Sequence, residues 1–168
     1  MAVVNVKSSQ ITNRDATPRV LSNASISKAE EKIAVGLVTS TSGDSIDSVY
    51  RFFSVPSNAR VHMLNLYCGD LGTTTIADFG LHDTTANGGA VVDRDFFASA
   101  VSLSGGALNG TDITHEADGA FGIDDGEKMI WQALGLTEDS KKDYDVTAML
   151  TAANDGTGFI LLKGAYAI

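Results

Sequence analysis

The chain has 168 residues, of which 43% are hydrophobic and 20% are charged, and it contains a single cysteine. This composition is typical of one globular domain, and it excludes a disordered chain, an internal disulfide and a cysteine cluster around zinc. The formal net charge of −9 argues against binding to a phosphate backbone, and no run of about 20 apolar residues predicts a membrane helix.

The first 26 residues differ from the rest of the chain in charge and composition. They contain no aromatic residue, and their three cations and one acid give a net charge of +2, which leaves −11 for the rest of the chain. We therefore expect residues 1–26 to form an extended arm and residues 27–168 to form the domain. A frayed terminus is the alternative interpretation. The candidate partner-binding residues are the cations of the arm: Lys7, Arg14 and Arg19.

The body of the chain is predicted to begin with four short strands separated by turn residues, at 32–41, 48–55, 59–68 and 73–82. In the third, one face is predicted to carry His62, Leu64, Leu66 and Cys68, and the opposite face Val61, Met63, Asn65 and Tyr67. Both faces of several segments are partly apolar, which is typical of a sheet that something else covers.

The second half of the chain predicts a long connection, one helix and a hairpin. Residues 105–126 are rich in glycine and acids and indicate the connection. A short helix is predicted over 125–136, with Gly135 as its terminator. Near the C-terminus, the alternating run 144–152 and the apolar run 157–162 flank Asn-Asp-Gly, residues that tolerate positive φ, so we predict that they pair as an antiparallel hairpin.

Taken together, these elements predict an all-β fold. We expect an antiparallel β-sandwich, jelly-roll-like, with one short helix and an extended N-terminal arm. The 17 glycines against two prolines favour many tight turns between its strands.

No arrangement of side chains predicts catalysis, a metal or a cofactor. The three histidines, His62, His82 and His115, lie in separate predicted elements, and no zinc motif connects them. Cys68 lies in an apolar run, which indicates a buried, unreactive thiol. The sequence has no nucleophile elbow, phosphate loop or dinucleotide fingerprint. We therefore expect that the chain is not an enzyme.

Acidic residues cluster in segment 118–127. Asp124, Asp125 and Glu127 stand near the start of the predicted helix, where their charge suits the helix dipole. A calcium site is the alternative interpretation, although the spacing does not match an EF-hand.

Several segments resemble a group of small virion structural proteins from tailed bacteriophages, and together they span nearly the whole chain. They are Val6 to Pro18, Arg51 to Arg60, Thr84 to Asp93, Trp131 to Thr137, and Tyr144-Asp145-Val146. None of them is a catalytic signature. The nearest characterised proteins in this resemblance are head cement, or decoration, proteins with jelly-roll folds, which sit on the outside of the capsid and bridge neighbouring major capsid proteins.

The resemblance implies a structural virion protein that bridges and stabilises major capsid protein subunits at the capsid surface. It also implies a homo-oligomer on the particle, made in the host bacterial cytoplasm, which agrees with a start that lacks the pattern of a signal peptide. We expect neither nucleic acid nor membrane as a partner. A receptor- or glycan-binding virion module and a head–tail or tail component are the alternatives. A glycan site would need exposed aromatics in a groove, whereas the aromatics here mostly fall in strand patterns.

Overall fold

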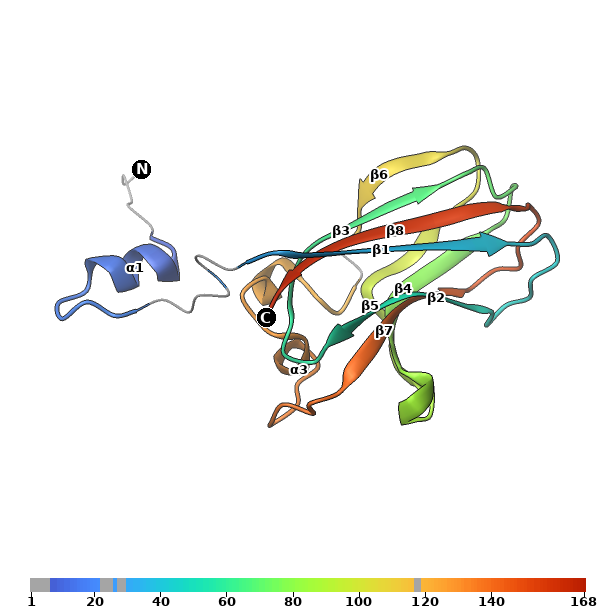
Figure 1. Cartoon of the computed structure of the whole chain (residues 1–168). Coiled ribbons are helices and arrows are strands. Elements are labelled where there is room, and N and C mark those ends of the chain that lie inside the picture. The colour runs from blue at the N-terminus through green and yellow to red at the C-terminus, as the bar shows by residue number, and fades with distance from the viewer. Residues whose placement is uncertain (1–6, 22–25, 27–29, 117–118) are drawn as a thin grey trace.

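The structure is a computed structural model, and it describes residues 7–21, 26, 30–116 and 119–168. Two four-stranded antiparallel sheets pack face to face (Figure 1). The first sheet has the order β1 (Lys32–Ser40), β8 (Gly158–Ala167), β3 (Arg60–Cys68) and β6 (Leu108–Asp112). The second has the order β2 (Val49–Pro56), β7 (Asp143–Leu150), β4 (Ile76–Asp83) and β5 (Val91–Ser102). The predicted antiparallel β-sandwich is confirmed.

The strand pairings are nested along the chain. The first strand pairs with the last, β2 pairs with β7, β3 with β6, and β4 with β5. Two further pairings, β3 with β8 and β4 with β7, join these pairs into the two sheets. All four strands predicted in the first half of the body are present, each boundary within three residues of its predicted position.

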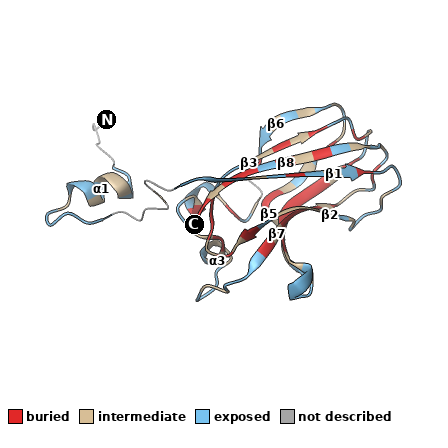
Figure 2. Ribbon diagram, viewed as in Figure 1, coloured by how far each residue is buried: buried red, intermediate tan, exposed pale blue. Residues whose placement is uncertain are grey.

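The core lies between the two sheets (Figure 2). Buried and less buried residues alternate along most of β3, whereas six consecutive residues of the central strand β4 are buried. Leu64, Leu66 and Cys68 face inward from β3 as predicted. His62 was expected on the same face, but it is exposed and Val61 is buried. A register shift between Val61 and Met63 causes this difference, because an extra residue in one strand reverses the alternation beyond it.

The predicted C-terminal hairpin is wrong, because β7 and β8 belong to different sheets. No residue from 151 to 157 has the positive φ that a tight hairpin turn requires. Instead, the loop crosses between the sheets, and Asn154, only 2% exposed, is anchored in it. Its side-chain nitrogen donates to Thr41 O at 2.8 Å, and its side-chain oxygen accepts from Thr75 Oγ1 at 2.9 Å.

The predicted helix over 125–136 is reduced to a single turn, α3 (Ile130–Ala133), preceded by the 3-10 turn η2 (Ile123–Asp125). Met129 between them is extended, and the amides of Ile130 and Trp131 donate to Ala59 O and Ser57 O in the loop before β3. These tertiary hydrogen bonds take the place of the bonds that the two amides would make within the predicted helix. Gly135, with φ of 71°, ends the segment as predicted.

Two further elements differ from the sequence predictions. The segment predicted as a long connection contains the five-residue edge strand β6, and β5 was not predicted. A second 3-10 turn, η1 (Thr85–Asn87), precedes β5.

The arm is not extended throughout, since residues Ser9–Asp15 form helix α1. Ser8 caps it by accepting a hydrogen bond from Ile11 N, and none of its residues is buried. In Figure 1 the helix lies beyond the end of the sandwich at which β1 begins. Residues 1–6 and 22–25 of the arm lie outside the described residues. Within the described part of the chain, no helix has the length and apolar character needed to span a membrane.

Candidate interaction surfaces

Two of the three predicted arm cations converge on one carboxylate. Lys7 Nζ lies 2.9 Å from Asp15 Oδ2, and Arg14 Nε lies 2.8 Å from Asp15 Oδ1. Hydrogen bonds from Arg14 and then Lys7 lower the pKa of Asp15 to about 2. Arg19 lies farther along the arm and is exposed, next to exposed Val20. All three cations remain at the surface, but two are partly neutralised within the arm.

The arm also touches the sandwich. Ser9 Oγ lies 2.8 Å and 2.9 Å from the two carboxylate oxygens of Glu127, to which it donates. This contact is exposed, so water competes with it and it holds the arm only weakly.

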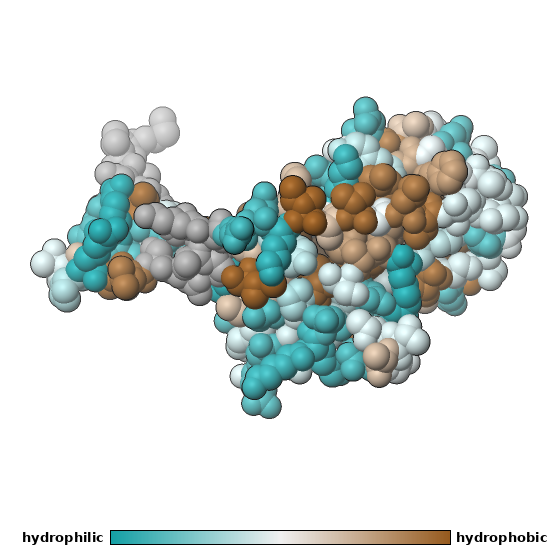
Figure 3. Space-filling model, in the orientation of Figure 1, coloured by the Kyte–Doolittle hydropathy of each residue, from teal (hydrophilic) through white to brown (hydrophobic). Residues whose placement is uncertain are grey.

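The outer surface of the first sheet is apolar along β1. Ile33, Val35 and Leu37 point outward there and are 74%, 55% and 60% exposed, and Phe159 on neighbouring β8 is 61% exposed. Figure 3 shows the apolar residues of β1 as a brown row across this side of the molecule. We call this surface the β1–β8 face, and define it by Ile33, Val35, Leu37, Met63, Tyr67, Phe159, Leu161 and Lys163.

The register makes the β1–β8 face continuous across three strands. Leu37 lies opposite Leu161, which lies opposite Tyr67 on β3. At the other end of the face, Ile33 on β1 and Met63 on β3 both lie opposite Ala165 on β8. Contiguous exposed apolar surface of this kind is typical of interaction sites, whereas scattered exposed apolar residues are ordinary.

One end of the face is hollowed into a groove of about 570 Å³. Its lining comprises Leu37, Tyr67, Cys68, Gly69, Ala107, Leu108, Asn109, Phe159 and Leu161. Cys68 is buried, as predicted, and burial raises the pKa of its thiol. A protonated thiol is a poor nucleophile, so the groove offers contact surface rather than chemistry.

Lys163 is the charged member of the β1–β8 face. In the register it lies between Val35 on β1 and Asn65 on β3, with apolar rows on either side. Its Nζ lies 4.8 Å from the centre of the Tyr67 ring. The ring attracts the ammonium and limits where it points.

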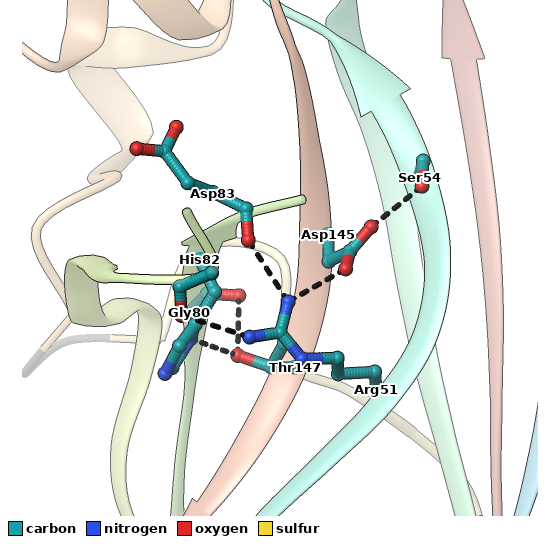
Figure 4. Close-up of polar contacts among 8 residues, drawn as sticks. Arg51, Ser54, Gly80, His82, Asp83, Asp145 and Thr147 are labelled. Carbon is teal, nitrogen blue, oxygen red and sulfur yellow. Dashed lines mark hydrogen bonds and ion pairs between the residues drawn. The ribbon is translucent and has the colours of Figure 1, made fainter. Parts of the chain in front are cut away.

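The second sheet carries a polar network rather than an apolar surface (Figure 4). The Arg51 guanidinium donates to Asp145 Oδ2 at 2.6 Å, to Asp83 O at 2.9 Å and to Gly89 O at 2.9 Å. Ser54 Oγ donates to the second oxygen of Asp145 at 2.6 Å. These bonds tie β2 and β7 to the end of β4 and the loop after it, so the network is engaged in holding the fold.

The three histidines have separate surroundings. His62 Nδ1 lies 3.6 Å from Glu31, and His115 stacks on Phe121 with ring centres 4.8 Å apart. His82 is buried with its Nδ1 2.8 Å from Thr147 Oγ1, and burial, followed by the charge of Arg51, lowers its pKa.

No metal site is found in the part of the chain that the structure describes, where no three His, Cys, Asp or Glu side chains are grouped around a common point. In the acidic segment 118–127, the Asp125 carboxylate accepts from Lys128 Nζ and from Gly122 N. Asp118 lies outside the described residues.

The β1–β8 face was not predicted from the sequence. The available signal was that both faces of several predicted strands were partly apolar, which indicates a covered sheet. In the structure, the outward residues of β1 remain exposed. The sequence could not show whether another part of the same chain would cover them.

No family model and no curated protein matches the sequence. The fold, however, is similar to that of solved capsid chains. A chain in the capsid asymmetric unit of cyanophage Pam1 superposes with a TM-score of 0.55 and 14% identity, over 92% of this chain and 96% of that chain. A chain in the capsid of Ralstonia phage GP4 superposes with a TM-score of 0.54 and 15% identity, over 84% and 86% of the two chains. The two-sheet fold of this protein therefore also occurs among the chains of phage capsids.

Proposed function

We propose that this chain is a structural protein of a phage particle, and specifically a capsid cement (decoration) protein that bridges and stabilises major capsid protein subunits. The observation that carries the proposal is the shared fold with the Pam1 capsid chain, which extends over 92% of this chain and 96% of that one. The nested strand order, 1-8-3-6 against 2-7-4-5, supports classing the sandwich as a jelly roll.

The surface supports a role based on contact. An exposed apolar face and a basic arm are two separate attachment surfaces on a small rigid body. The division into an arm of residues 1–26 and a domain of residues 27–168 belongs to this proposal. An arm that orders on docking adds contact area, and many identical weak contacts on a symmetric shell add up through multivalency. We propose a location on the capsid surface, homo-oligomers on the particle, and neither nucleic acid nor membrane as a partner.

The experiment is to measure the copy number of the protein per particle. Quantitative mass spectrometry of purified virions of the encoding phage gives this number. On the order of hundreds of copies is expected for a protein that follows the symmetry of the capsid lattice. A dozen or fewer would instead indicate a head–tail or tail component, and absence from the virion would refute a structural role.

A glycan-binding virion module is the second candidate. The observation in its favour is that the aromatic rings of Phe159 and Tyr67 line the groove. A glycan site needs aromatic rings in a groove, and the sequence alone did not predict such an arrangement. A glycan array probed with the full-length protein tests this candidate. Binding that Phe159→Ala abolishes would support it.

A further inference from the structure

We propose that the β1–β8 face docks onto a capsid protein surface that presents apolar side chains around one carboxylate, and that this carboxylate pairs with Lys163. The inference rests on the proposed function and names the chemistry of the partner. It concerns a surface distinct from the arm.

The β1–β8 face has the character of a surface that a partner covers. Ile33, Val35 and Leu37 occupy alternate positions on one strand and are all more than half exposed. Phe159 and Leu161 continue the apolar surface on β8. A strand with its apolar residues on the solvent side gains stability only when a partner removes that surface from water.

Lys163 determines the charge that the partner must carry. Lys163 stands in the middle row of the face, between apolar rows on both sides. Any partner that covers the face takes its ammonium out of water. An ammonium that is buried without an opposite charge is strongly destabilising, so a stable complex requires an acceptor at this point. The contact with Tyr67 places the ammonium ready for a carboxylate.

A second copy of the same face does not fit as the occupant. A two-fold axis through the middle of the face would bring Lys163 against Lys163, since a symmetric contact pairs the same patch with itself. Like charges at the centre of an interface oppose association. The charge of the face therefore favours a different surface, one with a carboxylate.

A glycan is also a weaker fit. Sugars are recognised by several polar groups around an aromatic platform, whereas five of the nine residues that line the groove are Leu37, Leu108, Leu161, Ala107 and Cys68. Asn109 supplies the one side-chain amide in the lining.

The experiment measures binding of the full-length protein to purified heads of the encoding phage that lack it. Leu37→Asp places an anion in the face and is expected to weaken binding on the order of tenfold or more. Ile123→Asp is the matched control, because Ile123 is 85% exposed on η2 and does not belong to the face. Both residues are exposed, so both variants should fold, which circular dichroism and thermal melting verify.

The charge is tested at Lys163. Lys163→Glu should weaken binding more than Lys163→Met, because the glutamate repels the partner carboxylate and the methionine only leaves it unpaired. Added salt should weaken the wild-type complex more than the Lys163→Met complex. Lys141→Glu, at an exposed lysine in the loop before β7, controls for the change in net charge and should bind like wild type.

The outcomes separate the inference from the proposed function. Failure of the wild-type protein itself to bind heads would overturn both. Two outcomes would overturn the inference alone, provided that the wild-type protein binds heads. In the first, Leu37→Asp and Ile123→Asp weaken binding equally. In the second, Lys163→Glu and Lys163→Met bind equally. A dimer that Leu37→Asp dissociates in the absence of heads, or a glycan that occupies the groove, would overturn it as well.

Discussion

At the scale of single residues, Tyr50 on β2 contacts both the end of β1 and the loop that joins β1 to β2. Its hydroxyl donates to Asp44 Oδ2 at 2.6 Å and lies 3.4 Å from Ser40 Oγ. Burial, followed by the hydrogen bond to Asp44, raises the pKa of Tyr50 to about 12. The folded protein therefore holds this proton more tightly than the unfolded chain does.

This difference predicts a loss of stability at alkaline pH. Because the folded-state pKa of Tyr50 is raised, its contribution is complete below the ordinary pKa of 10 and is lost as the pH rises from there to about 12. Tyr50→Phe should be less stable at neutral pH and should lose less stability over that window. Urea unfolding at a series of pH values measures both effects.

A spectroscopic titration provides the control. Ultraviolet absorbance of tyrosinate should show an ionisation step near pH 12, and that step should be missing in Tyr50→Phe. Parallel stability curves for the two proteins would contradict the assignment.

The residue scale also shows what the sequence could not predict about the candidate site. Lys163 is visible in the sequence as one lysine in an apolar run. Its neighbours Val35 and Tyr67 lie in strands that are distant in the chain, and only the register places them beside it. Side-chain surroundings of this kind depend on strand pairing, which one sequence does not specify.

At the scale of elements, β1 and β2 approach each other closely where the two sheets meet. A Cβ atom on Gly36 would lie 2.5 Å from Phe52 O and 2.6 Å from Phe52 Cβ. Phe52 O is a backbone atom of β2, which is paired with β7, so it cannot move aside without disturbing β2. Glycine is therefore required at this position by the packing of the sheets.

We predict that Gly36→Ala lowers the free energy of unfolding by about 1–3 kcal/mol, as overpacking does in other cores. Gly69→Ala is the matched control, because nothing lies within 4 Å of its added Cβ and its φ is not in the left-handed region. The control should change stability by less than about 0.5 kcal/mol. Urea denaturation of both variants measures the difference, and equal losses would refute the packing explanation.

The element scale also explains the wrong hairpin prediction. The alternating run 144–152 and the apolar run 157–162 correctly indicated strands at β7 and β8, because such patterns report how the side chains of a strand are buried. Neither pattern reports the partner of a strand. The loop between β7 and β8 crosses from one sheet to the other, and the buried side-chain amide of Asn154 anchors it there. The hydrogen-bond partners of this amide, Thr41 and Thr75, are remote in sequence.

At the scale of the whole molecule, the arm and the sandwich are predicted to have separable roles. Deletion of residues 1–26 should leave the melting temperature nearly unchanged, because α1 contributes no buried residue. The same deletion should lower occupancy on heads, since it removes attachment surface and positive charge. Calorimetry and quantitative gels of head-bound protein measure the two effects.

A charge-only variant separates the two contributions of the arm. Lys7→Gln, Arg14→Gln and Arg19→Gln together keep the length of the arm and remove its predicted contacts. Occupancy close to that of the deletion would assign attachment to the cations. Undiminished occupancy after deletion would refute the attachment role of the arm.

The sequence by itself determined the fold class, most strands and the contrast between a basic start and an acidic body. These features follow from local periodicity and composition, which are properties of consecutive residues. Only the tertiary structure decided which strands pair, that β7 and β8 lie in different sheets, and that the apolar side of β1 faces solvent. Those features arise from contacts between segments far apart in the chain, and local pattern carries no information about them.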